Sequence, residues 1–200
     1  YKRQVLCAKN AAALQAMNEI IKERQVEKTY RCVTVGVPNP DHATCKAFLR
    51  RDTRTKTVTV FDKPQPDAKT ILTEYRVLRQ KNGLALLEVT LHTGRTHQIR
   101  AHMAHMGWPL LGDELYGGPM EEFPRQALHC AGVAFTHPIT GEQLCLTAPL
   151  PEDMAALLKK KGIGWRPVLT PFVEELLTVQ PTTVEEITER YRKPKQKGRP

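Results

Sequence analysis

Alternating apolar and polar positions run through the middle of the chain and predict a series of β-strands. Residues 28–37, 70–78 and 84–91 are rich in β-branched and aromatic side chains. The dipeptide Asn82-Gly83 lies between the last two segments and is a strong signal for a two-residue hairpin turn. Further hairpins are expected from residues 44–49 with 55–61, and from residues 128–135 with 144–147.

Helical periodicity is confined to shorter segments. Residues 11–24 carry an apolar stripe and follow Asn10, a suitable N-cap. A second helix is expected over residues 152–160, directly after Pro151. Strands that predominate between a few helices indicate an α+β fold, with a mixed, mostly antiparallel sheet and flanking helices.

The stretch from Leu91 to Gly107 predicts a strand, a turn and a short helix. Gly94 is expected to take a positive φ, and Thr96 is a candidate N-cap for a helix that starts at His97. Apolar residues at helical spacing would face the core, and Gly107 suits the helix C-terminus.

The same stretch holds the most concentrated polar chemistry of the chain. Two arginines and two histidines fall within residues 95–102, around the predicted start of a helix. Guanidinium groups beside exposed helix amides favour an anion. The alternative is a solvated helix start whose arginines serve no binding function.

The net charge of +9, from 30 Lys and Arg against 21 Asp and Glu, favours a polyanionic partner. The hairpin over residues 44–61 is basic and could lie along an RNA backbone, or it could be a solvated edge protected by charge. The five cysteines include no C-x-x-C pair, which suits free thiols in a reducing cytosol. No run of about 18 apolar residues predicts a membrane span.

A metal site built on His97, His102 and His105 is a weaker hypothesis. On a helix His102 and His105 would share a face, whereas His97 would lie off it. No carboxylate or cysteine completes a familiar ligand set. A metal-dependent hydrolase is therefore the least favoured class, and no metal is expected.

The central motif resembles the signature of the RluA-type pseudouridine synthases. It comprises Thr93-Gly94-Arg95-Thr96-His97-Gln98-Ile99-Arg100, then His102, Gly107, Pro109 and Gly112-Asp113-x-Leu115-Tyr116-Gly117. Lys28-Thr29-Tyr30, Thr73-Glu74-Tyr75-x-Val77 and Leu128-His129-Cys130 resemble further family segments in the same order. The resemblance covers roughly residues 5 to 158.

The resemblance implies roles for individual residues. Arg100 matches the arginine that pairs with the catalytic aspartate, and Tyr30 matches the tyrosine whose ring stacks on the flipped uracil and whose hydroxyl is proposed to act on the base-carbon proton. Leu128 matches an apolar floor of the base pocket, although a plain core leucine is the alternative. Arg95, Thr96, His97 and Gln98 are expected to bind RNA or to brace the loop.

The resemblance also implies a His-Arg-Leu-Asp segment with the nucleophilic aspartate, and Tyr1-Lys2-Arg3-Gln4 does not match it. We therefore expect residues 1–160 to form a pseudouridine synthase catalytic domain without its N-terminal part, and residues 161–200 to form a partly helical extension with a basic tail. None of the aspartates in the sequence is expected to substitute as nucleophile. Without that carboxylate, Arg100 would be an unpaired charge.

The function implied is isomerisation of specific uridines in ribosomal or transfer RNA. The reaction uses no cofactor, and the enzyme is expected to be a cytoplasmic monomer that binds structured RNA. The alternative is a catalytically inactive synthase-like protein that still binds RNA.

Overall fold

A computed structural model describes residues 7–164 except 53 and 56. Seven strands of this described part form one sheet in the order β3-β2-β4-β5-β1-β6-β7, and every neighbouring pair is antiparallel. The strands are β1 (Glu27–Val35), β2 (His42–Arg51), β3 (Val58–Phe61), β4 (Lys69–Lys81), β5 (Leu84–Leu91), β6 (Leu128–Thr136) and β7 (Gln143–Thr147). The predicted α+β fold with a mostly antiparallel sheet is confirmed.

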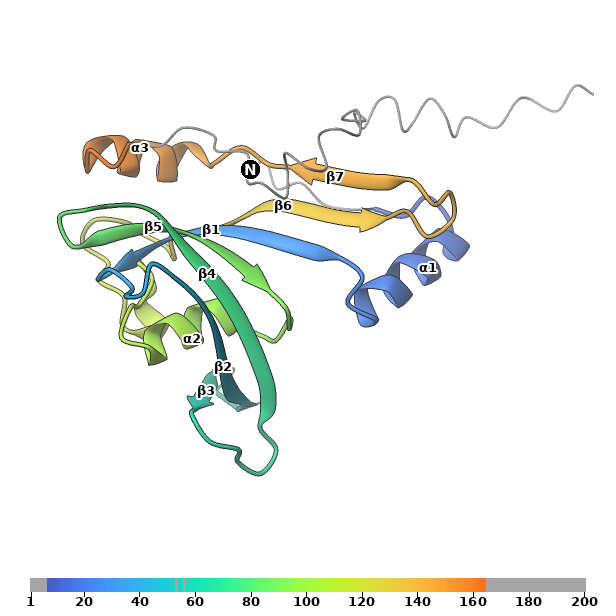
Figure 1. Ribbon diagram of the computed structural model, residues 1–200, viewed down its shortest axis with the longest axis horizontal. Coiled ribbons are helices and arrows are strands. Elements are labelled where there is room, and N and C mark those ends of the chain that lie inside the picture. The colour runs from blue at the N-terminus through green and yellow to red at the C-terminus, as the bar shows by residue number, and fades with distance from the viewer. Residues whose placement is uncertain (1–6, 53, 56, 165–200) are drawn as a thin grey trace, which may run out of the picture.

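Within the described residues, three α-helices flank the sheet: α1 (Ala11–Lys22), α2 (Gln98–His105) and α3 (Glu152–Lys160), with a short 3₁₀ turn, η1 (Glu114–Tyr116). In Figure 1, α2 and α3 lie on opposite sides of the central strands, and α1 lies near the far end of β6 and β7. The predicted N-cap is present, because the Asn10 side chain accepts a hydrogen bond from the amide of Ala13 at 2.8 Å.

The centre of the sheet is buried on both faces. Leu86 packs in one apolar cluster with Met154 and Leu158 of α3, whereas its neighbour Leu87 packs in another with Ile99 and Met103 of α2. Successive residues of a strand point to opposite faces, so β5 serves both clusters and is nearly continuous in hydrophobic residues. One charged residue of β5, Glu88, pairs with Arg31 of β1.

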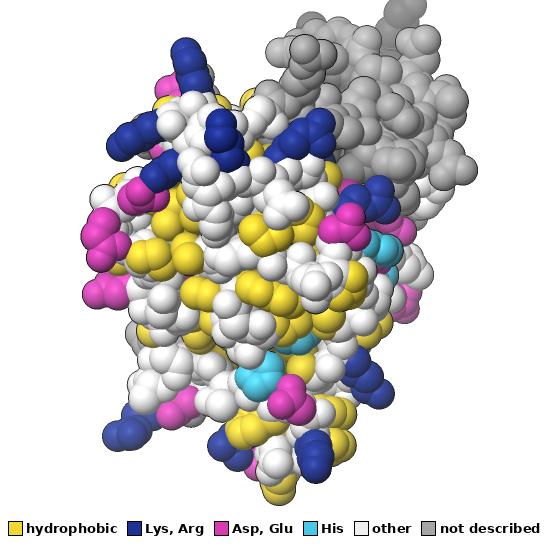
Figure 2. Space-filling view, turned by 60° about the vertical axis from the view of Figure 1, so that its left-hand side comes forward, with side chains coloured by type: hydrophobic (Ala, Val, Ile, Leu, Met, Phe, Trp, Pro, Cys, Tyr) yellow, Lys and Arg dark blue, Asp and Glu magenta, His cyan; other side chains and the backbone are white. Residues whose placement is uncertain are grey.

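The hairpin between β4 and β5 has the predicted turn. Asn82 and Gly83 both have positive φ, 52° and 75°, as a type I′ turn requires. The hairpin therefore sets the position of β5 beside β4, and residues 92–97 follow at the end of this central strand. Figure 2 shows a surface with hydrophobic side chains across its middle and Lys and Arg side chains at its upper and lower margins.

Residues 165–200 lie outside the described residues, and so does most of the predicted C-terminal extension. The helix expected at residues 152–160 is present as α3.

Candidate active site

The loop between β5 and α2 is held by the side chain of Gln98. Its Oε1 accepts hydrogen bonds from the Thr93 hydroxyl at 2.8 Å and from the Arg95 amide at 3.1 Å. Its amide nitrogen donates to the Leu72 carbonyl at 3.1 Å and to the Thr73 hydroxyl at 3.0 Å. Gln98 is 2% exposed, and a side-chain amide offers two donors and about two acceptor positions, so its capacity is used within the protein.

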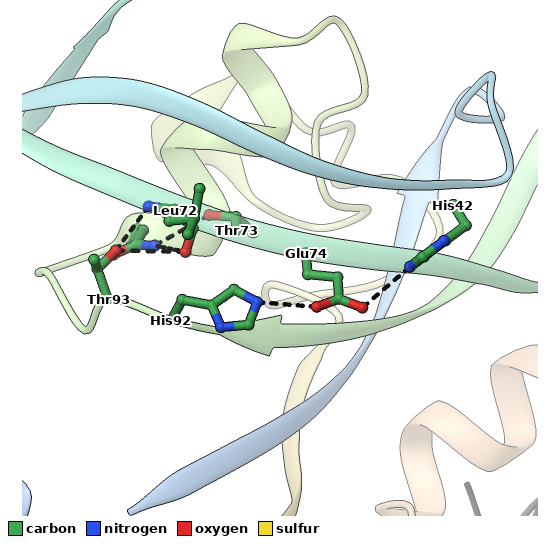
Figure 3. Close-up of polar contacts among 7 residues, drawn as sticks. His42, Leu72, Thr73, Glu74, His92 and Thr93 are labelled. Carbon is green, nitrogen blue, oxygen red and sulfur yellow. Dashed lines mark hydrogen bonds and ion pairs between the residues drawn. The ribbon is translucent and has the colours of Figure 1, made fainter. Parts of the chain in front are cut away.

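Thr93 adds a second anchor between the same loop and β4. Its hydroxyl accepts from the amide of Leu72 at 2.9 Å, and Figure 3 shows the two residues side by side. The loop therefore joins strand β4 through buried polar contacts, which gives α2 a rigid starting point.

Two local predictions for this loop were wrong. Thr96 is not the N-cap: His97 occupies that position with φ 52°, and no side chain caps the helix. The helix starts one residue later because the Gln98 backbone amide donates to the Arg95 carbonyl at 3.1 Å in a turn, and the first helical bond runs from the Ala101 amide to the His97 carbonyl at 2.9 Å. Gly94 does not have a positive φ; the left-handed residue of this loop is His97.

Arg100 forms a two-point ion pair with Asp113. Nε donates to Oδ2 at 2.7 Å and Nη2 donates to Oδ1 at 2.6 Å. The aspartate side chain is fully buried and the arginine side chain is 16% exposed. The bond to Asp113 raises the pKa of the Arg100 guanidinium. The expectation that Arg100 would be unpaired was therefore wrong.

Two glycines allow the turn that brings Asp113 beneath α2. Gly112 has φ 73°, and a Cβ there would lie 2.0 Å from the Arg125 carbonyl oxygen. A Cβ on Gly118 would lie 1.9 Å from the Leu110 carbonyl oxygen. Only residues without side chains fit such close backbone approaches, which explains the spacing of the motif around Asp113.

Tyr116 joins Arg100 to His97. The guanidinium carbon of Arg100 lies 5.1 Å from the centre of the tyrosine ring, and Nδ1 of His97 lies 2.9 Å from its hydroxyl. Burial, and next the charge of Arg100, lower the pKa of His97. From the sequence, Asp113 was expected only to match the family's Gly-Asp structural turn, and no separate role was predicted for Tyr116. Their place in the motif was the signal that they contact Arg100.

Tyr30 and Leu128 lie on neighbouring strands, β1 and β6, and both border the apolar cluster beneath α2. A β-bulge separates Thr29 from Tyr30 and shifts the register with β6. Burial, followed by the charge and hydrogen bond of Cys130, raises the pKa of Tyr30 to about 12.

The structure thus gathers the predicted residues into two sets. Arg100 and His97 share one polar cluster, and Tyr30 and Leu128 share an apolar wall. Ile99 of α2 belongs to the core cluster against which that wall packs, so the helix of Arg100 and the strand of Tyr30 share one core. No hydrogen bond or ion pair connects Arg100 to Tyr30 within the described residues.

The three histidines considered as metal ligands have separate partners. His97 contacts Tyr116, His102 contacts the Thr73 hydroxyl at 2.9 Å, and Nε2 of His105 lies 2.7 Å from Asp62. Across the part of the chain that the structure describes, no group of three or more His, Cys, Asp or Glu side chains could hold a metal ion.

The described aspartates have structural surroundings. Asp113 is buried beneath Arg100, Asp52 accepts bonds from the amides of Arg54 and Thr55 in a turn, and Asp153 pairs with Arg125 at the start of α3. Asp52 and Asp153 agree with the sequence prediction of turn, cap or surface residues. Asp113 does more than shape its turn, because its buried carboxylate pairs with Arg100.

Comparison with known proteins identifies the family. The family model described as RNA pseudouridylate synthase matches residues 4–105. A protein of Chlorobaculum parvum described as an uncharacterized RNA pseudouridine synthase is 38% identical over 174 residues, covering 78% of this chain and 53% of the relative. Ribosomal large subunit pseudouridine synthase D of Haemophilus influenzae is 33% identical over 168 residues, covering 77% of this chain and 51% of the relative.

A solved structure agrees with these sequence matches. Human RNA pseudouridylate synthase domain containing 1 has a TM-score of 0.69 at 25% identity, over 87% of this chain and 74% of that one. This chain spans about half the length of the curated relatives it matches. No helix within the described residues is long and apolar enough to cross a membrane. The chain belongs to the RNA pseudouridylate synthase family, among its RluA-type members.

Proposed function

We propose that this protein isomerises uridine to pseudouridine in structured RNA, with Arg100 and Tyr30 at the reacting nucleotide. In that reaction the bond from ribose C1′ to uracil N1 breaks and a bond from C1′ to C5 forms. N1 gains a proton and C5 loses one, so the reaction needs no redox partner. The observation that carries the proposal is the Arg100–Asp113 pair within the family motif.

Arg100 is suited to hold a second carboxylate. Asp113 bonds Nε and Nη2, and Nη1 has no described hydrogen-bond partner. A guanidinium carries five N–H donors, so the remaining edge can bind the carboxylate that acts at the sugar and lower its pKa. We propose that this carboxylate comes from a segment outside the described residues.

Tyr30 is suited to stack on the base. With a pKa of about 12 its hydroxyl stays protonated at neutral pH. A protonated phenol is a weak acceptor for a proton from C5, whereas its ring offers a face for uracil. The proposal therefore assigns stacking to Tyr30, with Leu128 beside it as the apolar floor of the pocket.

The loop residues divide by exposure. Gln98 is buried and fully bonded, so we propose that it positions the loop and does not touch RNA. Thr96 is exposed and Arg95 is partly exposed, and both remain candidates for RNA contacts. His97 is proposed to brace Tyr116 beneath Arg100.

The experiment is tritium release from RNA whose uridines carry tritium at C5, because each isomerisation frees that hydrogen. Release by the protein, and loss of release in Arg100→Ala and Arg100→Lys, is expected. Lysine keeps the charge but lacks the two-point geometry that holds Asp113. Near-normal release by both variants would refute the assignment of Arg100. RNA binding without release would favour the inactive RNA-binding alternative.

The choice of RNA follows from the names of relatives. Three of them are named as ribosomal large subunit enzymes, which supports testing ribosomal RNA before transfer RNA. We propose that the protein acts as a monomer in the cytoplasm, where both substrates occur.

A further inference from the structure

A groove of about 590 Å³ opens at the end of the central strands, where β5 ends and β4 begins. Its lining includes four Lys or Arg residues and a histidine, and no Asp or Glu: Arg24, Lys46, Lys69, Thr70, Leu72, His92, Thr93 and Arg95. The sequence predicted RNA contacts for Arg95 and for the basic hairpin that contains Lys46. It did not predict that Arg24 and Lys69 join them, because these residues come from separate segments that the fold brings together.

The positive charges of the groove are not neutralised within the protein. Neither Lys46 nor Lys69 forms an ion pair with a described residue, and the same holds for Arg24 and Arg95. Other arginines behave differently, since Arg100 is paired with a carboxylate. A basic cavity without internal counterions favours an anionic ligand.

Arg95 provides an independent sign of a missing partner. Its Nε is the buried side-chain nitrogen or oxygen that lacks a hydrogen-bond partner among the described residues. Buried polar atoms almost always have partners, and an unpaired guanidinium N–H that borders a basic groove suits a phosphate oxygen.

His92 adds a ring whose orientation is fixed at the margin of the groove. Nε2 of His92 lies 2.9 Å from one oxygen of Glu74, and Nε2 of His42 lies 3.1 Å from the other. Figure 3 shows the carboxylate between the two rings. Glu74 thus holds His92 at the margin of the groove through contacts that lie outside the groove lining.

Lys46 and Leu72 of the groove lie on the sheet face opposite to Tyr30, and neither Tyr30 nor Leu128 belongs to the groove lining. Lys46 pairs with Leu72, and the side chains of Leu72 and Glu74 point to one face of the sheet because they are two positions apart on β4. Tyr75 follows Glu74 and points to the other face. Tyr75 and Tyr30 both pair with Val89, which belongs to the core cluster beneath α2. The groove is therefore separate from the wall formed by Tyr30 and Leu128.

We propose that this groove binds backbone phosphates of the RNA substrate, at a place distinct from the nucleotide that reacts. The inference rests on the proposed function to the extent that the ligand is the same structured RNA. Lysine and arginine contacts to phosphates supply affinity and orientation without reading the sequence. The groove should accordingly strengthen RNA binding and leave the chemical step unchanged.

The test compares two double variants of equal charge. Lys46→Gln/Lys69→Gln removes two exposed lysines of the groove, and Lys159→Gln/Lys160→Gln removes two exposed lysines of α3. The probe is an unmodified transcript of large-subunit ribosomal RNA, and its dissociation constant is measured across a salt series. The groove variant should bind roughly tenfold more weakly, with a salt slope smaller by about one per lysine.

Equal losses of RNA affinity in the two double variants would overturn the proposal that the groove binds RNA, because net charge alone would then explain the loss. Arg95→Lys keeps the charge and removes the Nε donor, so it should also weaken binding; unchanged affinity in that variant would count against a phosphate at Arg95. Inorganic phosphate serves as a competitor. It should displace RNA only at high concentration, because a single phosphate makes few of the contacts that a polyanion makes. Tight binding of phosphate alone would contradict an RNA site.

The outcome separates this inference from the proposed function. Binding needs no turnover, so loss of affinity in the groove variant would support the groove even if no tritium were released. Conversely, release of tritium with unaltered affinity in the groove variant would leave the proposed function intact and refute the groove.

Discussion

Arg100 and Asp113 form a two-point ion pair in which the carboxylate is fully buried and the guanidinium keeps one edge available. The pair joins the first turns of α2 to the glycine-rich turn that follows it. The aspartate thereby fixes the orientation of the guanidinium group of Arg100. A second carboxylate could then bind that group in one defined geometry.

Replacement of Asp113 by Asn should destabilise the protein by about 3 kcal/mol, because removal of one partner leaves a largely buried charge. The matched control is Asp153→Asn, which alters the exposed pair with Arg125 and should cost less than about 1 kcal/mol. The free energy of unfolding in urea measures both. Equal losses would show that burial adds nothing to the Arg100–Asp113 pair.

Replacement of Gln98 by Glu should destabilise the fold by at least about 2 kcal/mol, because it puts a buried carboxylate against the Leu72 carbonyl. The control is Gln143→Glu, at an exposed position of β7, and its effect on stability should be close to zero. Urea denaturation gives the stabilities. If Gln98→Glu folds normally yet loses RNA affinity, Gln98 contacts RNA directly and the positioning role is wrong.

Tyr30→Phe should retain RNA affinity within about twofold, since the stacking face remains. Tyr30→Leu keeps an apolar, though smaller, side chain without an aromatic face, and it should weaken binding roughly tenfold. Fluorescence anisotropy with labelled RNA measures both constants. Equal affinities for the two variants would argue against stacking at Tyr30.

Stability should decline as the pH falls from about 6.5 to about 4, because burial lowers the pKa of His102 from 6.5 to about 4. The folded protein then holds this ring neutral while the unfolded chain binds a proton, so protonation favours unfolding and stability is complete above pH 6.5. The shift corresponds to roughly 3 kcal/mol at low pH. His97 contributes in the same direction, also through burial.

The measurement is urea denaturation at pH 7 and pH 4.5, and His102→Gln should show a smaller difference between the two than the unaltered protein. Glutamine retains a polar atom near the Thr73 hydroxyl but does not titrate. An equal difference in both proteins would assign the acid sensitivity to other groups.

Local sequence patterns were sufficient for the strands, α1, α3 and the β4–β5 hairpin. The Asn82-Gly83 turn is an example, because its backbone angles depend on two adjacent residues alone. The motif from Thr93 to Arg100 likewise pointed to the region of the site. The start of α2 could not be read correctly, since Gln98 is bonded to residues of β4 more than twenty positions earlier.

The sequence by itself indicated candidate residues for the chemistry and determined which segments form the sheet, because both depend on residue type and on short-range periodicity. Only the tertiary structure decided that Asp113 neutralises Arg100 and that Arg24, Lys46, Lys69 and Arg95 line one groove. Both arrangements join positions far apart in the chain. They depend on strand register and on turns that pass close to other backbone segments, and no local pattern encodes those distances.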